Sequence, residues 1–161
     1  GLATSSTTWN VIANPVMMAG LNIGTAAEPK YTLDMWDGYP AARERLLARI
    51  VDSKVSNPVV VTGDWHASFV LDVKREPTGP TIMPEFLGTS ISTVLFAQDY
   101  RPENPHVRYF VAENGYAVAT ITPDDFTCEF KYIGDVWDPN SAITHTDAWR
   151  VRAGQHEPEQ V

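Results

Sequence analysis

Two potential metal ligands follow directly on an apolar run of the sequence. In VVVTGDWHASFVLDV, residues 59–73, Asp64 and His66 come after three valines, a threonine and Gly63. A carboxylate oxygen and an imidazole nitrogen together suit Zn, Fe or Mn. Side chains two residues apart in an extended backbone point to the same side, and a glycine lets the backbone approach a ligand closely. We therefore predict that Asp64 and His66 bind a metal at a catalytic site; the alternative is that Asp64 caps a turn and His66 is a packed core histidine.

Two ligands do not complete a catalytic metal site, which normally has three or more protein ligands plus water. Other potential ligands have simpler explanations. Glu85 is expected to be a solvated strand residue, with support of a metal ligand as the alternative. His106, His145 and His156 are expected at the surface, and Cys128 is expected to be a small buried apolar group inside an alternating strand.

One helix and a buried strand are predicted to position the two ligands. The stretch 41–54 is apolar at i, i+4 and i+8, and Pro40 stands where a first helical position should be. The sequence thus predicts one clear helix at about residues 40–54. The run 58–64 is apolar on both faces, which is typical of a central strand covered on both sides. A helix followed by a buried strand predicts layers, in which ligands gather at the carboxyl ends of strands.

The remainder of the chain is predicted to be mostly β. Single strands are expected at residues 10–13, 68–74, 81–90 and 148–154. Three β-branched and aromatic runs, at 107–114, 116–122 and 126–133, are separated by Asn114-Gly115 and by Pro123-Asp124-Asp125. Because Asn-Gly is a strong signal for a two-residue hairpin, these runs predict consecutive hairpins.

Charge and composition exclude several classes of function. The 161 residues suit one domain, and their net charge is −8 with no basic cluster, so a nucleic-acid or anionic-membrane footprint is not expected. No apolar run approaches the roughly 18 to 20 residues that span a bilayer. With a single cysteine, no disulfide can form within the chain. An acidic chain repels phosphorylated substrates, so a bound cation would have to receive one.

Five ordered blocks resemble a known family. They are WNVIANPVMM, YTLDMWDGYPAARERLL, NPVVVTGDWHASFVLDVK, EFLGTSIS and NPHVRYFVAENGYAVATITPD. The chain resembles, over about residues 1–154, the carboxy-terminal half of the PhoD-like alkaline phosphatases and phosphodiesterases of the calcineurin-like metallophosphoesterase superfamily. Gly63, Asp64 and His66 match the last metal motif of that family. The resemblance therefore implies that residues 1–161 are the carboxy-terminal part of a single metallophosphatase domain.

The same resemblance implies a fold, a reaction and partners. The fold is an α+β, αββα sandwich with the metals at one rim, of which this chain should supply a mostly β half: one sheet with its flanking helix and the trailing hairpins. The reaction is metal-dependent hydrolysis of phosphate monoesters or diesters, with Fe and Ca ions as cofactors and Zn or Mn as alternatives. The family location is periplasmic or secreted. Because the other family ligands lie in the amino-terminal half, that half is the expected partner, in the same polypeptide or as another chain, and this chain alone is expected to be incomplete.

Two alternatives remain open on the sequence. The first is a non-catalytic β-rich binding module, for instance for carbohydrate, which would use exposed tryptophans and tyrosines and would still bind in EDTA or after His66→Ala. The second is an inactive fragment of the phosphatase, which folds only with its partner segment.

Overall fold

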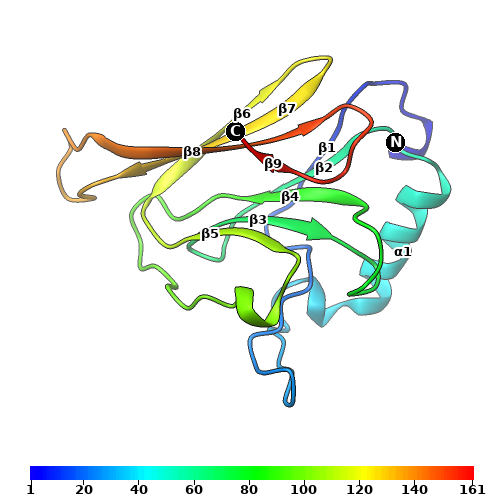
Figure 1. Ribbon diagram of the computed structural model, residues 1–161, viewed down its shortest axis with the longest axis horizontal. Coiled ribbons are helices and arrows are strands. Elements are labelled where there is room, and N and C mark those ends of the chain that lie inside the picture. The colour runs from blue at the N-terminus through cyan, green and yellow to red at the C-terminus, as the bar shows by residue number, and fades with distance from the viewer.

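Two β-sheets stack face to face, and a single helix covers the outer face of one of them (Figure 1). The structure is a computed structural model that describes residues 1–161. The five-stranded sheet has the order β1-β2-β4-β3-β5, and the four-stranded sheet has the order β6-β7-β8-β9. The strands of the first sheet are β1 (Asn10–Ala13), β2 (Pro58–Thr62), β3 (Ser68–Val73), β4 (Met83–Leu87) and β5 (Val107–Val111). Those of the second are β6 (Gly115–Ile121), β7 (Asp125–Ile133), β8 (Ile143–Arg152) and β9 (Glu159–Gln160).

The helix α1 (Pro40–Asp52) begins at the predicted proline and buries Leu47 and Ile50 against the five-stranded sheet. Three short 3₁₀ turns complete the helical structure: η1 (Leu2–Thr4), η2 (Trp36–Gly38) and η3 (Arg101–Glu103). The mostly β architecture with one clear helix is thus confirmed, and the chain supplies both a five-stranded and a four-stranded sheet where one sheet with trailing hairpins was expected. No helix in the structure has the length and apolar character that a membrane span requires.

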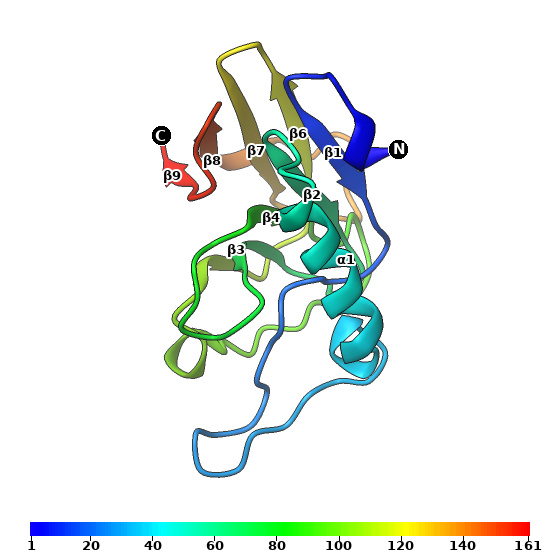
Figure 2. The same ribbon diagram turned by 90° about the vertical axis from the view of Figure 1, so that its right-hand side faces the viewer.

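The central strands of the first sheet are buried on both faces. Val60 and Leu71 pack into the core on the helix side, whereas Val59 and Val70 pack into the core between the two sheets. Figure 2 shows this arrangement edge on, with α1 on one side of the sheet and β6 and β7 on the other. The valine run therefore behaves as predicted, because alternate residues face two different apolar layers.

The Asn-Gly pair does not form a hairpin, so that prediction is wrong. β5 pairs with β3 in the first sheet, and β6 pairs with β7 in the second, so the chain crosses between sheets at Asn114. Gly115 begins β6, where a Cβ would collide with the backbone of Lys131. Close strand approach thus accounts for this glycine. The hairpin between β6 and β7 is confirmed, and β8 is longer than the short strand expected at 148–154.

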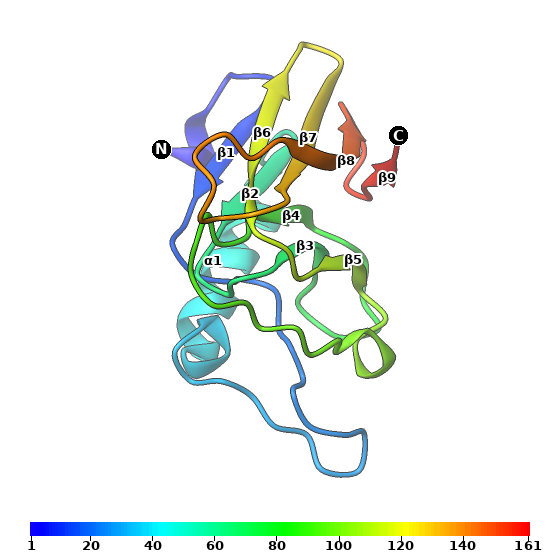
Figure 3. The same ribbon diagram turned by 90° about the vertical axis from the view of Figure 1, so that its left-hand side faces the viewer.

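One edge strand of each sheet, β1 in the first and β6 in the second, lies on the same side of the sandwich (Figures 2 and 3). The Trp9 indole, just before β1, donates a hydrogen bond to the carbonyl of Thr122, just after β6, at 2.7 Å. All of β6 except Gly115 is exposed, although the strand contains a tyrosine, a valine and an isoleucine. Both sheets therefore present an unpaired edge at this side.

Candidate metal centre

Asp64 and His66 lie in residues 63–67, which connect β2 to β3 at the carboxyl end of β2. Both have a left-handed backbone, with φ of 73° at Asp64 and 58° at His66. The prediction of an extended backbone across this stretch is therefore wrong. Left-handed residues that carry a Cβ cost on the order of 1–3 kcal/mol each and persist only where their surroundings impose them, as often happens at functional sites.

Trp65 anchors this turn in the core. It is 7% exposed and packs edge-on against Phe69 and Tyr100, with ring centroids 6.3 and 6.1 Å away. Its flanking residues lie further out, because Asp64 is exposed and His66 is half-buried. The buried indole therefore fixes the turn from within, and Trp65 is a core residue as predicted.

The His66 ring lies against a second aromatic ring from a distant loop. Phe96 stacks on it with the ring centroids 4.8 Å apart and the planes 8° from parallel. The Phe96 N–H also donates a hydrogen bond to the His66 carbonyl at 3.3 Å. His66 Nδ1 is buried and has no hydrogen-bond partner. His66 Nε2 also makes no hydrogen bond and is not among the buried atoms, so Nε2 is the ring nitrogen that is open to a cation.

The donor types of Asp64 and His66 fit a metal ion, since an exposed carboxylate stands two residues from an imidazole whose Nε2 makes no hydrogen bond. No group of three or more His, Cys, Asp or Glu side chains in the chain is placed to hold a metal. The chain by itself thus offers a partial ligand set.

Glu85 is fully buried, which corrects the expectation that it is solvated. Its Oε1 accepts hydrogen bonds from the Met18 N–H at 2.9 Å and from Thr62 Oγ1 at 2.6 Å, and its Oε2 accepts one from the Ala19 N–H at 2.7 Å. Burial raises the pKa of Glu85, and the three donors oppose that effect. The carboxylate therefore ties the segment after β1 to the last residue of β2, next to Gly63.

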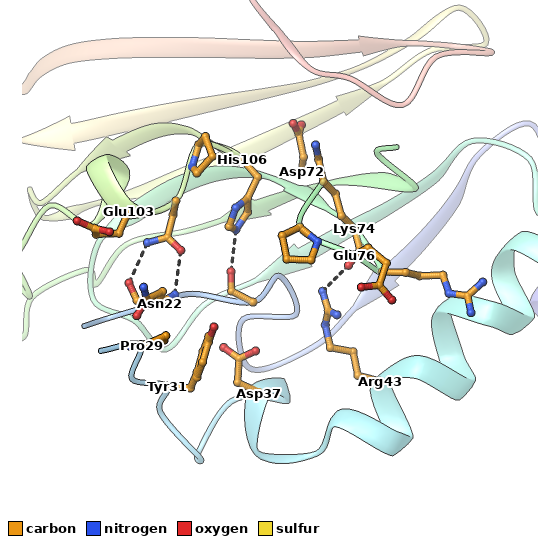
Figure 4. Close-up of a pocket in the computed structure, with 15 residues that line it drawn as sticks. Asn22, Pro29, Tyr31, Asp37, Arg43, Asp72, Lys74, Glu76, Glu103 and His106 are labelled. Carbon is orange, nitrogen blue, oxygen red and sulfur yellow. Dashed lines mark hydrogen bonds between the residues drawn. The ribbon is translucent and has the colours of Figure 1, made fainter. Parts of the chain in front are cut away.

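His106 is half-buried, where an exposed residue was expected, and it does not join the metal loop. Its Nε2 lies 2.7 Å from the Gly20 carbonyl oxygen, and burial lowers its pKa. It lines a polar cavity of about 340 Å³ together with Asp37, Arg43 and Lys74 (Figure 4). Lys74 directly follows β3, so this cavity lies at the opposite end of β3 from His66, on the order of 20 Å away at about 3.3 Å per residue.

The remaining candidates keep their predicted roles. His145 and His156 are exposed, and no metal-holding group includes them. Cys128 is 2% exposed, and burial raises the pKa of its thiol to about 12. Of the five tryptophans, Trp137 alone is exposed, so the tryptophans do not share an exposed binding face.

Sequence signals for the missed residues were weak. Glu85 is a lone charge within an apolar strand, and this pattern could have indicated a buried carboxylate. Phe96 stands in a loop of mixed composition, where only the folded chain reveals its contact with His66.

The chain is similar to known proteins in both sequence and structure. Residues 1–130 match the family model described as PhoD-like phosphatase. The chain is 39% identical over 153 residues to alkaline phosphatase D of Bacillus subtilis (strain 168), an alignment that covers 89% of the chain and 26% of that protein. A solved structure described as "Structure of PhoD" matches with a TM-score of 0.90 and 33% identity, covering 99% of this chain and 33% of that one.

The two-sheet sandwich and its strand-end loop are those of a phosphatase fold, since the backbone superposes on such a structure over nearly its whole length. The chain belongs to the PhoD-like phosphatase family. It spans 26% and 33% of the lengths of the two relatives, so it corresponds to one part of a larger protein of this kind.

Proposed function

We propose that these residues form the carboxy-terminal part of a metallophosphatase domain that hydrolyses phosphate monoesters or diesters. The observation that carries this proposal is the strained turn at the end of β2, which holds Asp64 and His66 in a chain of the PhoD-like family. Backbone strain of this kind is retained where function requires it.

Asp64 and His66 are the catalytic residues of this part, and their role is to hold a metal ion. The ion, when bound, supplies a water of lowered pKa and neutralises charge on the phosphoryl oxygens. Asp64 contributes the negative charge, and His66 contributes a neutral nitrogen donor that is shielded on one face by Phe96. Trp65 holds both residues at the rim by staying in the core.

The family resemblance favours iron and calcium as the metals. A single carboxylate and a single imidazole also suit Zn and Mn, so elemental analysis of the purified protein is the direct measurement. The family resemblance likewise favours export to the periplasm or beyond the cell.

The remaining ligands and the rest of the fold come from the amino-terminal part of the domain, in the same polypeptide or as another chain. The proposed place of attachment is the side of the sandwich where β1 and β6 are edge strands, because six of the seven residues of β6 are exposed there. Tyr116 and Val118 on the outer face of β6, and Ile121 on its inner face, are exposed apolar side chains for it to cover. On this proposal, the isolated chain has little or no phosphatase activity.

A chimera tests the proposed function. The matching segment of B. subtilis alkaline phosphatase D is replaced by this chain, and turnover of p-nitrophenyl phosphate and of bis-p-nitrophenyl phosphate is measured. We expect turnover that falls by at least about a hundredfold in Asp64→Asn and in His66→Ala, because each change removes a metal ligand. Comparing the two substrates also establishes the preference for monoesters or diesters.

Glu76→Gln is the matched control, because Glu76 is an exposed carboxylate away from the loop. It should leave turnover unchanged. A chimera that folds, judged by circular dichroism, and turns over equally well with and without Asp64 and His66 would contradict the proposal.

A further inference from the structure

The orientation of the His66 ring needs a physical cause. The torsion that rotates a histidine ring is broad and roughly two-fold, so the side chain does not fix its own plane. In most metal sites the second ring nitrogen donates a hydrogen bond that sets this plane. His66 Nδ1 is buried and makes no hydrogen bond, so no hydrogen bond from the second nitrogen sets the plane of this ring.

The stacked Phe96 ring can take the place of that orienting hydrogen bond. A centroid distance of 4.8 Å and an angle of 8° between planes form an offset stack, in which rotation of the imidazole would drive its edge into the phenyl face. The backbone hydrogen bond from Phe96 to the His66 carbonyl keeps the two residues in register. Phe96 is nevertheless 48% exposed, so burial in a core does not explain its position.

The loop that carries Phe96 is itself tied to the metal turn and to the sheet crossover. At its start, the Gly88 N–H donates to the carbonyl of Thr62, the last residue of β2, at 3.0 Å. In its middle, Asn114 Nδ2 donates to the carbonyls of Ser90 and Thr93 at 3.1 and 3.0 Å. These bonds hold the loop at the rim where Asp64 and His66 lie, which a loosely attached loop could not do.

We propose that Phe96 is a positioning residue: it fixes the plane of the His66 imidazole and so aims Nε2 at the metal position. This inference rests on the proposed function, because it gives His66 the role of a metal ligand. Phe96 touches neither substrate nor metal in this scheme. Its effect passes wholly through the ring of His66.

The test follows the His66 ring by nuclear magnetic resonance in the full 161-residue chain, with Co²⁺ alone as the probe. His66 signals are assigned from their loss in His66→Ala, which separates them from those of the exposed histidines. In the metal-free chain, protons above an aromatic face shift upfield, so Phe96→Leu should move the His66 ring signals downfield. The same variant should weaken Co²⁺ binding at His66 about tenfold or more, the range seen when the partner that orients a metal-bound histidine is lost.

Two further variants decide between positioning and a general effect on the loop. Phe96→Tyr keeps the flat ring and should retain both the ring shift and the affinity. Val94→Ala, at a 66% exposed position of the same loop, should change neither. Unaltered His66 signals and affinity in Phe96→Leu would overturn the inference and leave the metal assignment standing. A Co²⁺ response that does not depend on His66 would instead count against the proposed function, while the metal-free ring shift still reports on the stacking.

Discussion

Replacing Glu85 by glutamine tests the buried carboxylate that joins three segments of the fold. Glu85 is 0% exposed, and every polar contact to its side chain is a donated hydrogen bond, two from backbone N–H groups and one from Thr62. Glutamine has nearly the same shape but turns a donor toward one of these partners. The change therefore perturbs hydrogen bonding with little change in packing.

The expected cost can be worked from these contacts. The amide oxygen of glutamine can still accept from Met18 and Thr62, but the amide nitrogen then faces the Ala19 N–H, which is left unpaired. An unsatisfied buried donor costs about 1–3 kcal/mol. For a domain of 150 to 250 residues, each kcal/mol lowers the melting temperature by roughly 2–4 °C, so we expect a decrease of about 2–12 °C. Glu85→Ala would leave the N–H groups of both Met18 and Ala19 unpaired, so it should cost about twice as much free energy of unfolding.

Thermal melts and urea titrations of Glu85→Gln, Glu85→Ala and Glu76→Gln measure these differences. Glu76 is exposed, so its variant should stay within about 0.5 kcal/mol of the unchanged chain. If Glu85→Gln proves as stable as Glu76→Gln, the carboxylate does not organise the segment after β1, and the reasoning from its hydrogen bonds fails.

Three further outcomes follow from the same structure. Burial lowers the pKa of His106 from 6.5, so below that value the unfolded chain binds more protons than the folded chain. Stability should therefore fall as pH decreases from about 6.5 toward the folded-state pKa. His106→Gln should flatten this part of the curve of unfolding free energy against pH, measured by urea titration, and an unchanged slope would contradict the reasoning. Asn114→Ala removes two loop hydrogen bonds worth roughly 0.5–1.5 kcal/mol each, so amide hydrogen exchange in residues 88–98 should accelerate, whereas unaltered exchange would show that the loop is held otherwise. Because the Cys128 thiol is buried with a pKa of about 12, a thiol reagent at pH 8 should label it only in denaturant, and rapid labelling of the native chain would disprove its burial.

Local pattern was enough to predict the elements that position the metal turn. Pro40 and the helical period give α1, and the valine run gives a strand that is buried on both faces and ends at Gly63. The same kind of local pattern did not predict which sheet each later strand joins. Asn114-Gly115 has the composition of a hairpin turn, yet the two flanking strands join different sheets, since β5 pairs with β3 and β6 pairs with β7.

The sequence by itself determined the types of donor in the turn, the helix, the strand before it and the likeness to a phosphatase family, since these depend on residues close together in the chain. Only the tertiary structure decided that the turn is left-handed at Asp64 and His66, that Glu85 is buried and His106 half-buried, and that Phe96 lies on the His66 ring. Each of these depends on segments 23 or more residues apart, or on a backbone conformation that such packing imposes. Contacts of this kind arise from the fold as a whole, because the period of a strand or helix specifies which face is apolar and leaves open what covers it.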